Sequence, residues 1–287
     1  MPEPNWNFML FYVIFLSQVL LISFYLPRHV LSRVRHVVDT YPPSTHPKLY
    51  PVPIDTVEKA LRTYRNLNTV ALLAGFALVL IGVSSPSEEM LNWDSQSVLL
   101  IYFFLQISPL ILGARTGVKY FRLMRNTRSR NTRTAELHPR RLFDFVSPTF
   151  VGVAILTYIT LLLLILYIRQ NPFPGFAGYV NIFAVTALNM ALAAIGYAAI
   201  FAPRRDPHQA YEDRLRQIEL VVKTIVLTSI VANTFLAMTF VLPALGLRDF
   251  TDMFSMLYYQ LCAVISFRAF RIDNMSLEVY KEDLAVA

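Results

Sequence analysis

Seven long runs of apolar residues alternate with polar segments along this chain. A bilayer with a hydrocarbon core of about 30 Å requires roughly 17 to 25 helical residues per crossing, and all but the last and shortest of the runs reach that length. The pattern predicts an all-α, polytopic membrane helix bundle with seven transmembrane helices in a single domain, 1–287. The predicted crossings are residues 8–26, 67–83, 98–114, 147–168, 179–202, 222–245 and 253–267.

The composition agrees with this pattern. Hydrophobic residues make up 55% of the chain and charged residues only 16%, whereas a soluble domain carries about a quarter charged residues. A soluble fold is therefore excluded. The first run resembles a signal peptide in position, but Met1 to Asn7 contain no positive charge and no small-residue cleavage site follows. We therefore expect the first run to remain in the mature protein as a helix.

Basic residues are distributed unequally between the two sets of gaps. Of the 26 Lys and Arg residues, 24 fall in or at the edge of the segments 27–66, 115–146 and 203–221 or follow the last run. Positively charged loops stay in the cytoplasm, so these three segments are predicted cytoplasmic loops. The amino terminus is then outside and the carboxyl terminus cytoplasmic. No eukaryotic targeting signal is present, and a bacterial inner (plasma) membrane is the expected compartment.

Helix start signals stand before three of the crossings. Asp55 and Glu58 have the spacing of a capping box, which predicts a helix that continues into the second crossing. Ser147 and Asp206 are capping residues followed by proline, and they predict helix starts before the fourth crossing and at residue 209. Small residues recur along the fifth run, which predicts that its helix packs closely against neighbours.

Five of the crossings carry a neutral amide close to their midpoints. An unpaired amide in hydrocarbon costs several kcal/mol, so these side chains should face the bundle interior. They either bond one another and fix the helix register, or they line a polar pocket or conduit for a ligand. The candidate ligand-binding residues are Gln18, Gln106, Asn189, Asn233 and Gln260.

The second cytoplasmic segment combines dense arginine with apolar and aromatic residues. This mixture is typical of segments that lie against an anionic leaflet, where each basic residue contributes about 1 kcal/mol. The topology accounts for most of the basic excess, and no nucleic-acid partner is expected. The candidate lipid-binding residues are Arg115, Lys119, Arg122, Arg125, Arg128, Arg140 and Arg141.

Motifs for catalysis, metal binding or cofactor binding are not found in the sequence, so no catalytic residue, metal or cofactor is predicted. The five histidines all fall on the predicted cytoplasmic side without ligand spacing: His29, His36, His46, His138 and His208. The crossings contain no Asp, Glu, Lys, Arg or His away from their ends, which disfavours proton-coupled transport through a buried charged residue. The single cysteine, Cys262, is interpreted as a buried apolar residue.

Three functions remain open at this point. The first is a non-enzymatic accessory, assembly or scaffold subunit that contacts anionic phospholipid and other membrane subunits or further copies of itself. The second is a channel, transporter or small-molecule-binding protein that uses the midplane amides. The third is an interfacial lipid-modifying enzyme that uses His46, His138 or His208. A hydrated cavity at the amides would favour the second, and convergence of the histidines the third.

Overall fold

The computed structural model describes residues 6–84, 95–126, 140–201, 206, 208–248, 250–268 and 277–281. All regular secondary structure within these ranges is helical. Among the predicted site residues, Arg128 and His138 lie outside the described residues. The long helices are α1 (Trp6–Leu20), α2 (Leu26–Thr40), α3 (Ile54–Ser84), α4 (Ser95–Asn126), α5 (Pro148–Ile168), α6 (Tyr179–Phe201), α7 (Tyr211–Ala244) and α8 (Phe250–Arg268).

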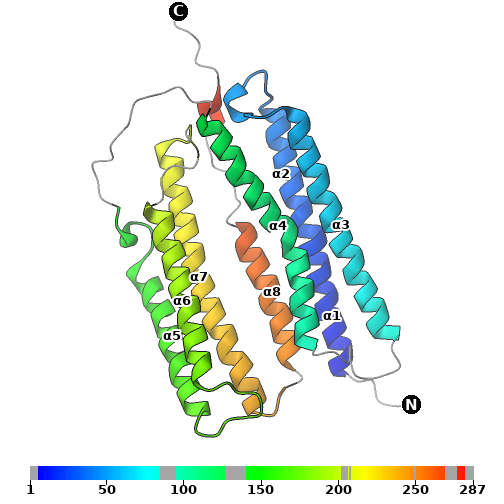
Figure 1. Ribbon diagram of the computed structural model, residues 1–287, viewed down its shortest axis with the longest axis vertical. Coiled ribbons are helices and arrows are strands. Elements are labelled where there is room, and N and C mark those ends of the chain that lie inside the picture. Colours follow the sequence, from blue (N-terminus) through cyan, green and yellow to red (C-terminus); the bar gives the residue numbers. More distant parts are fainter. Residues whose placement is uncertain are drawn as a thin grey trace, which may run out of the picture. The chain divides into compact units, whose positions relative to one another are not determined.

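Four short helical segments complete the description. A π-helical turn, η1 (Leu21–Tyr25), joins α1 to α2, so that the three segments form one continuous helix (Figure 1). The other three are single 3₁₀ turns: η2 (Pro47–Leu49), η3 (Leu142–Asp144) and η4 (Leu277–Tyr280).

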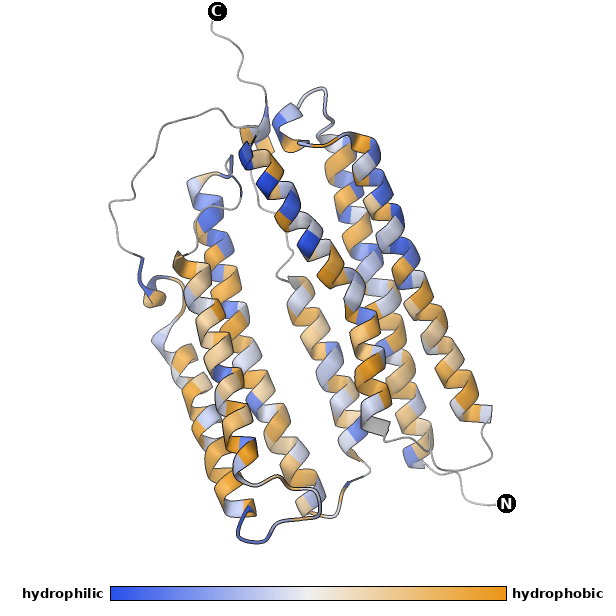
Figure 2. Ribbon diagram, viewed as in Figure 1, coloured by the Kyte–Doolittle hydropathy of each residue, from blue (hydrophilic) through white to orange (hydrophobic). Residues whose placement is uncertain are grey.

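Six helices are long and apolar enough to cross a membrane by length and composition. They correspond to the first six predicted crossings. The seventh predicted crossing, 253–267, lies within α8, but α8 does not reach the same hydropathy because Asp252, Tyr258, Tyr259 and Gln260 interrupt its apolar sequence. In α3, α4 and α7 the hydrophilic residues gather toward one end of the helix (Figure 2). These polar ends belong to the predicted cytoplasmic segments, which are thus partly helical.

The helix starts agree with the sequence in one case and differ in two. The Ser147 hydroxyl accepts a hydrogen bond from the Phe150 amide at 3.3 Å and caps α5, as predicted. Asp55 lies inside the first turn of α3, so it is not the capping residue. Helix α7 begins at Tyr211 instead of 209, because the Asp206 carboxylate accepts the His208 amide at 2.9 Å and forms a local turn there.

The chain divides into two compact units. The first comprises Met1–Ile14, Glu136–Ala202 and Leu215–Phe270, and we call it the α5–α8 unit. The second comprises Phe15–Ala135, Pro203–Arg214 and Arg271–Ala287, and we call it the α2–α4 unit. Each unit has its own buried core.

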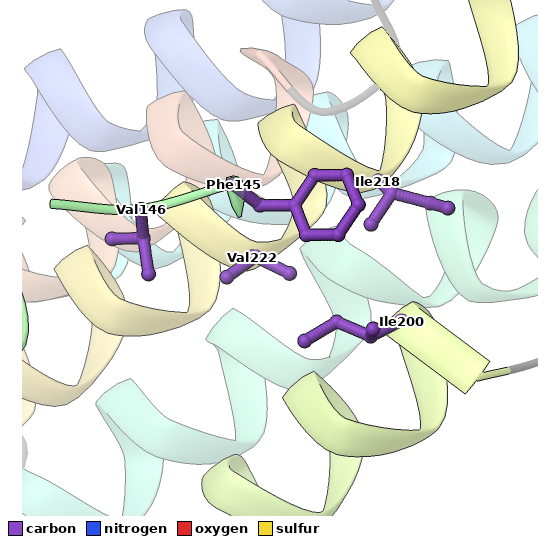
Figure 3. Close-up of a cluster of buried hydrophobic side chains, with 5 residues drawn as sticks. All are labelled: Phe145, Val146, Ile200, Ile218 and Val222. Atoms are coloured by element: carbon purple, nitrogen blue, oxygen red, sulfur yellow. The ribbon is translucent and has the colours of Figure 1, made fainter. Parts of the chain in front are cut away.

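In the α5–α8 unit, the segment before α5 is held by apolar packing. Phe145 and Val146 are buried against Ile200 of α6 and against Ile218 and Val222 of α7 (Figure 3). This cluster joins the start of α5 to the last turns of α6 and the first half of α7.

A second cluster lies further along the same three helices, where Leu161 and Ile165 of α5 pack against Val185 of α6. The small residues of α6 behave in two ways. Gly196 is buried, and a Cβ there would lie 3.7 Å from Ile225 of α7, whereas Ala194 is exposed. Close packing of α6 therefore involves one side of the helix only.

In the α2–α4 unit, α3 packs against η1, α2 and α4. Tyr102 of α4 is almost fully buried, and its hydroxyl donates a 3.0 Å hydrogen bond to the Ala71 carbonyl of α3. Gly75, one turn further along α3, faces the same hydroxyl and the side chain of Val19. The absence of a side chain at Gly75 is what allows α1, α3 and α4 to approach each other here.

Candidate functional site

Two of the predicted amides form a reciprocal pair between α6 and α7. Asn189 donates to the Asn233 side-chain oxygen at 2.9 Å, and Asn233 donates back to the Asn189 oxygen at 3.2 Å. Asn189 also donates to the Val185 carbonyl at 2.9 Å and accepts from Ser229 at 2.7 Å. Every polar atom of Asn189 is bonded within the protein, which is the arrangement that fixes helix register.

A second amide pair lies in the α2–α4 unit. Gln18 of α1, 0% exposed, donates to the Gln106 side-chain oxygen at 2.8 Å. Gln106 of α4 in turn donates to the Ser23 hydroxyl of η1 at 3.0 Å. The Gln18 side-chain oxygen has no hydrogen-bond partner among the described residues. This network is therefore less complete than the asparagine pair.

The fifth predicted amide has a backbone partner. Gln260 of α8 donates to the Ile14 carbonyl of α1 at 3.3 Å, within the α5–α8 unit. The structure thus brings Gln18 together with Gln106 and Asn189 together with Asn233. Their use as a ligand site stays a prediction.

The basic residues predicted to contact lipid form a stripe on α4. Arg115, Lys119, Arg122 and Arg125 are all exposed, and their spacing places them within roughly 120° of the helix circumference at 100° per residue. We call these four residues the α4 basic stripe.

The other side of α4 is anchored to the protein. Met124 is buried to 1% exposure, and the Tyr120 hydroxyl donates to the Leu49 carbonyl at 2.5 Å. This half of α4 is amphipathic, with its basic side directed outward.

Two arginines outside the stripe lie at a pocket in the α5–α8 unit. The pocket has a volume of about 540 Å³ and is lined by residues of α5, α6, α7 and the segment before α5. Arg140 and Arg141 stand at one end, and Asn189 and Ser229 at the other. The Arg140 guanidinium donates a 2.9 Å hydrogen bond to the Ile200 carbonyl in the last turn of α6.

The α2–α4 unit has a groove of its own, about 690 Å³, between the η1–α2 segment and α3. Arg28 and Arg35 of α2 and Arg65 of α3 border it, together with His36. Among the described residues that line it, Asp39 is the one carboxylate. The groove carries net positive charge. These three arginines were not among the sequence candidates, because their convergence depends on how α2 packs against α3.

The 3₁₀ turns η2 and η4 contact each other in the α2–α4 unit. Tyr280 is buried, and its hydroxyl donates to the Asp206 carboxylate. Burial, then the hydrogen bond to Asp206 and the negative charge there, raise the pKa of Tyr280 above its usual range. The His208 ring packs edge-on against the Tyr280 ring, with 5.9 Å between the two ring centroids. His46 is 4% exposed, with Nδ1 2.8 Å from the Thr45 hydroxyl.

The histidines relevant to an enzyme are thus placed in part. His46 and His208 both belong to the α2–α4 unit, in the neighbourhood of η4. Within the described residues, no group of three or more His, Cys, Asp or Glu side chains lies together so as to hold a metal ion. No family model, no curated protein and no solved structure matches this chain.

Proposed function

We propose that this chain is a non-enzymatic multi-pass protein of a bacterial inner membrane, an accessory, assembly or scaffold subunit that contacts anionic phospholipid with its basic cytoplasmic face. The observation that carries the proposal is the α4 basic stripe. Helix α4 has 32 residues and is about 48 Å long, which exceeds the roughly 30 Å hydrocarbon core. Its basic half therefore extends into the headgroup region and beyond.

The chemistry of the stripe suits a charged surface. Its four side chains are exposed and make no ion pair with another described residue. At about 1 kcal/mol per basic residue, the stripe would contribute up to about 4 kcal/mol of attraction to an anionic leaflet. This attraction falls with added salt, because exposed charges are screened beyond about 10 Å at 0.1 M ionic strength.

The amide pairs support a structural role more than a conduit. In the Asn189–Asn233 pair each side chain hydrogen-bonds the other, so a passing ligand would have to break these bonds to be recognised. Such a pair stabilises the contact between α6 and α7 without any ligand. The channel or transporter alternative is therefore the weaker of the two.

The proposed topology has seven crossings, with the amino terminus outside and the carboxyl terminus in the cytoplasm. The seventh crossing is α8, whose 19 residues span about 28 Å, close to the hydrocarbon thickness. Reporter fusions at each terminus test this topology in cells. Reporters on the same side of the membrane would overturn the seven-crossing arrangement.

Lipid contact is tested with the purified full-length chain in nanodiscs that contain phosphatidylglycerol and phosphatidylcholine. The measurement is the ratio of the two lipids retained by the protein in native mass spectrometry, at low and at high salt. The variant replaces Arg115, Lys119, Arg122 and Arg125 by Gln. It should lose most of the preference for phosphatidylglycerol, and the wild-type preference should decline with salt.

The matched control replaces Lys59 and Arg62 of α3 by Gln. These residues also lie in a predicted cytoplasmic segment, but Arg62 is 3.8 Å from Glu58, which offsets its charge. The control should retain the wild-type lipid ratio. An unchanged ratio in the stripe variant, or an equal loss in the control, would show that the stripe is not the lipid contact.

A further inference from the structure

The groove of the α2–α4 unit lies between the η1–α2 segment and α3, which are side by side in Figure 1. Its three arginines come from both walls: Arg28 and Arg35 from α2, and Arg65 from α3. Asp39 is the one carboxylate among the described lining residues, so with His36 neutral the groove has a net charge of +2. An anion in the groove would be contacted from two helices at once, which side chains on a single helix do not provide.

The polar groups of the groove are available to a ligand. Arg28, Arg35 and Arg65 are exposed, and none of them forms an ion pair with another described residue. The Arg28 guanidinium carbon lies 5.7 Å from the centroid of the Phe24 ring, a cation–π contact that leaves the in-plane N–H groups able to donate. The Ser32 hydroxyl has no hydrogen-bond partner among the described residues. Such donors match the oxygens of a phosphate group.

One end of the groove is apolar. Phe24 and Leu72 line this end, and they belong to the first and second predicted crossings. Arg28 and Arg65 each lie two residues beyond the cytoplasmic limit of those crossings, about 3 Å at 1.5 Å per residue. The headgroup layer adds roughly 5–8 Å on each side of the hydrocarbon core, so the backbone of both arginines lies at headgroup depth. The groove thus changes from apolar to basic where a phospholipid changes from acyl chain to phosphate.

The third arginine lies further from the membrane. Arg35 is two turns beyond Arg28 on α2, about 11 Å along the helix axis. Each Cα–Cβ bond of a helix tilts toward the amino terminus of that helix. The Arg35 side chain therefore starts back toward the membrane, whereas the Arg65 side chain, on the antiparallel helix α3, starts away from it. These directions favour convergence of the two charges on a single ligand.

We propose that this groove binds the phosphate group of an anionic phospholipid, with the phosphate at Arg28, Arg35 and Arg65 and an acyl chain leaving past Phe24 and Leu72. The excess positive charge favours a head group whose phosphate is not balanced by an ammonium group. Phosphatidylglycerol meets this condition and zwitterionic phosphatidylcholine does not. The inference rests on the proposed membrane crossings of the first long helix and α3, and it does not depend on the α4 basic stripe.

The test titrates the purified full-length chain in non-ionic detergent with dioleoyl phosphatidylglycerol. Native mass spectrometry resolves the first bound lipid from later ones and gives its dissociation constant. Phosphatidylcholine with the same acyl chains is the reference lipid. The wild type should bind the first phosphatidylglycerol at least about tenfold more tightly, because a net negative head group gains an attraction to the basic residues that a zwitterionic one does not.

Variants of the arginines test the place of the phosphate. Arg65→Gln should weaken the binding of the first phosphatidylglycerol about tenfold, since a hydrogen bond to a charged group contributes that much. The triple variant Arg28→Gln, Arg35→Gln, Arg65→Gln should bind both lipids equally. Arg62→Gln is the matched control, because Arg62 is exposed one turn earlier on α3, does not line the groove and lies 3.8 Å from Glu58. It should keep the wild-type dissociation constant.

A further pair of variants tests the position of the acyl chain. Thr69 lines the groove between Arg65 and Leu72, and its hydroxyl donates only to the Arg65 carbonyl of the same helix. Thr69→Phe places a ring in the groove and should remove the first binding event for both lipids. Val70→Phe is the matched control, because Val70 is the next residue on α3, is 58% exposed and does not line the groove. It should bind both lipids as the wild type does.

Glycerol phosphate distinguishes a lipid from a soluble anion, because it has the phosphate but no acyl chain. It should displace the first phosphatidylglycerol only at a concentration about a hundredfold or more above that of the lipid, since it buries no methylene groups. Displacement at equal concentration would assign the groove to a soluble phosphate compound and overturn the phospholipid as its ligand. Equal affinity of the wild type for the two lipids would also overturn the inference, as would full binding by Thr69→Phe.

The α4 stripe variant separates this inference from the proposed function. Loss of the first phosphatidylglycerol in the triple variant, with its retention in the stripe variant, would support the groove whether or not the stripe contacts lipid. Retention in the triple variant, with loss in the stripe variant, would overturn the groove as a lipid site and leave the proposed function standing.

Discussion

Substitution of Gly75 by alanine provides a sharp test of the packing in the α2–α4 unit. A Cβ at this position would lie 2.7 and 2.8 Å from the two methyl carbons of Val19, and closer still to the Tyr102 hydroxyl. Side chains do not approach to such distances, so Tyr102, Val19 or the helices themselves must move. Displacement of Tyr102 also breaks its hydrogen bond to the Ala71 carbonyl.

The magnitude follows from three contributions. Overpacking of a filled site costs about 1–3 kcal/mol. A tyrosine hydroxyl left buried without its partner costs about 1–3 kcal/mol more. The better helix propensity of alanine offsets about 0.5–1 kcal/mol. We expect Gly75→Ala to lower the free energy of unfolding by about 2–4 kcal/mol, measured by circular dichroism as the purified protein is titrated with SDS in mixed micelles.

The control is Gly113→Ala in α4, where an added Cβ meets no atom within 4 Å. This variant should be as stable as the wild type or slightly more stable. The double variant Gly75→Ala, Tyr102→Phe removes the hydroxyl that the new methyl group would meet, and it should recover part of the loss. Equal stability of Gly75→Ala and Gly113→Ala would refute the close packing described for Gly75.

Three further outcomes follow from single contacts. Asn233→Leu removes both side-chain hydrogen bonds to Asn189. At roughly 0.6 to 1.7 kcal/mol per bond, it should lower the free energy of unfolding by about 1–3 kcal/mol in the same titration. An unchanged free energy of unfolding would argue against the pair. Ser147→Ala removes the cap of α5 and should lower the free energy of unfolding by about 1 kcal/mol. Ser147→Asp should lower it by less, because aspartate is also a good capping residue. Because the pKa of Tyr280 is raised, its contribution to stability is present below pH 10 and is lost as the pH rises further. The protection factors of the η4 amides, which are exchange rates corrected for intrinsic base catalysis, should therefore fall at alkaline pH, and Tyr280→Phe should remove this fall.

Helix positions could be read from the apolar pattern, but most helix ends could not. The segment 27–40 is polar, yet it continues the helix of the first crossing as α2. The continuation of 54–66 into the second crossing was predicted from Asp55 and Glu58, and the single helix α3 confirms it. Backbone hydrogen bonding does not stop at the membrane surface, so the change from apolar to polar residues marks the bilayer and not the helix terminus. Ser147 was an accurate start signal because its side chain and the following proline act locally.

The candidate site was predictable only in its chemistry. The depth of Gln18, Gln106, Asn189 and Asn233 can be counted from the ends of each run, but their pairing depends on how each helix is rotated about its axis. The pocket beside Arg141 could not be anticipated for a similar reason. Its wall residues are ordinary apolar residues in sequence, and their concave arrangement arises only where α5, α6 and α7 pack.

The π-helical turn η1 changes the phase between the two parts of the first long helix. In that turn the backbone bonding advances to i+5, and the Leu26 amide donates to the Leu21 carbonyl, so the turn holds one residue more than an α-helical turn. Gln18 before the turn and Ser23 within it both belong to the hydrogen-bond network of Gln106. If the same residues were wound as a regular α-helix, the residues after the turn would be rotated by roughly 100°, which would carry Arg28 and Arg35 away from the groove they share with Arg65. The wide turn thus absorbs one extra residue and sets, at one point, the azimuth of every basic side chain that follows it on α2.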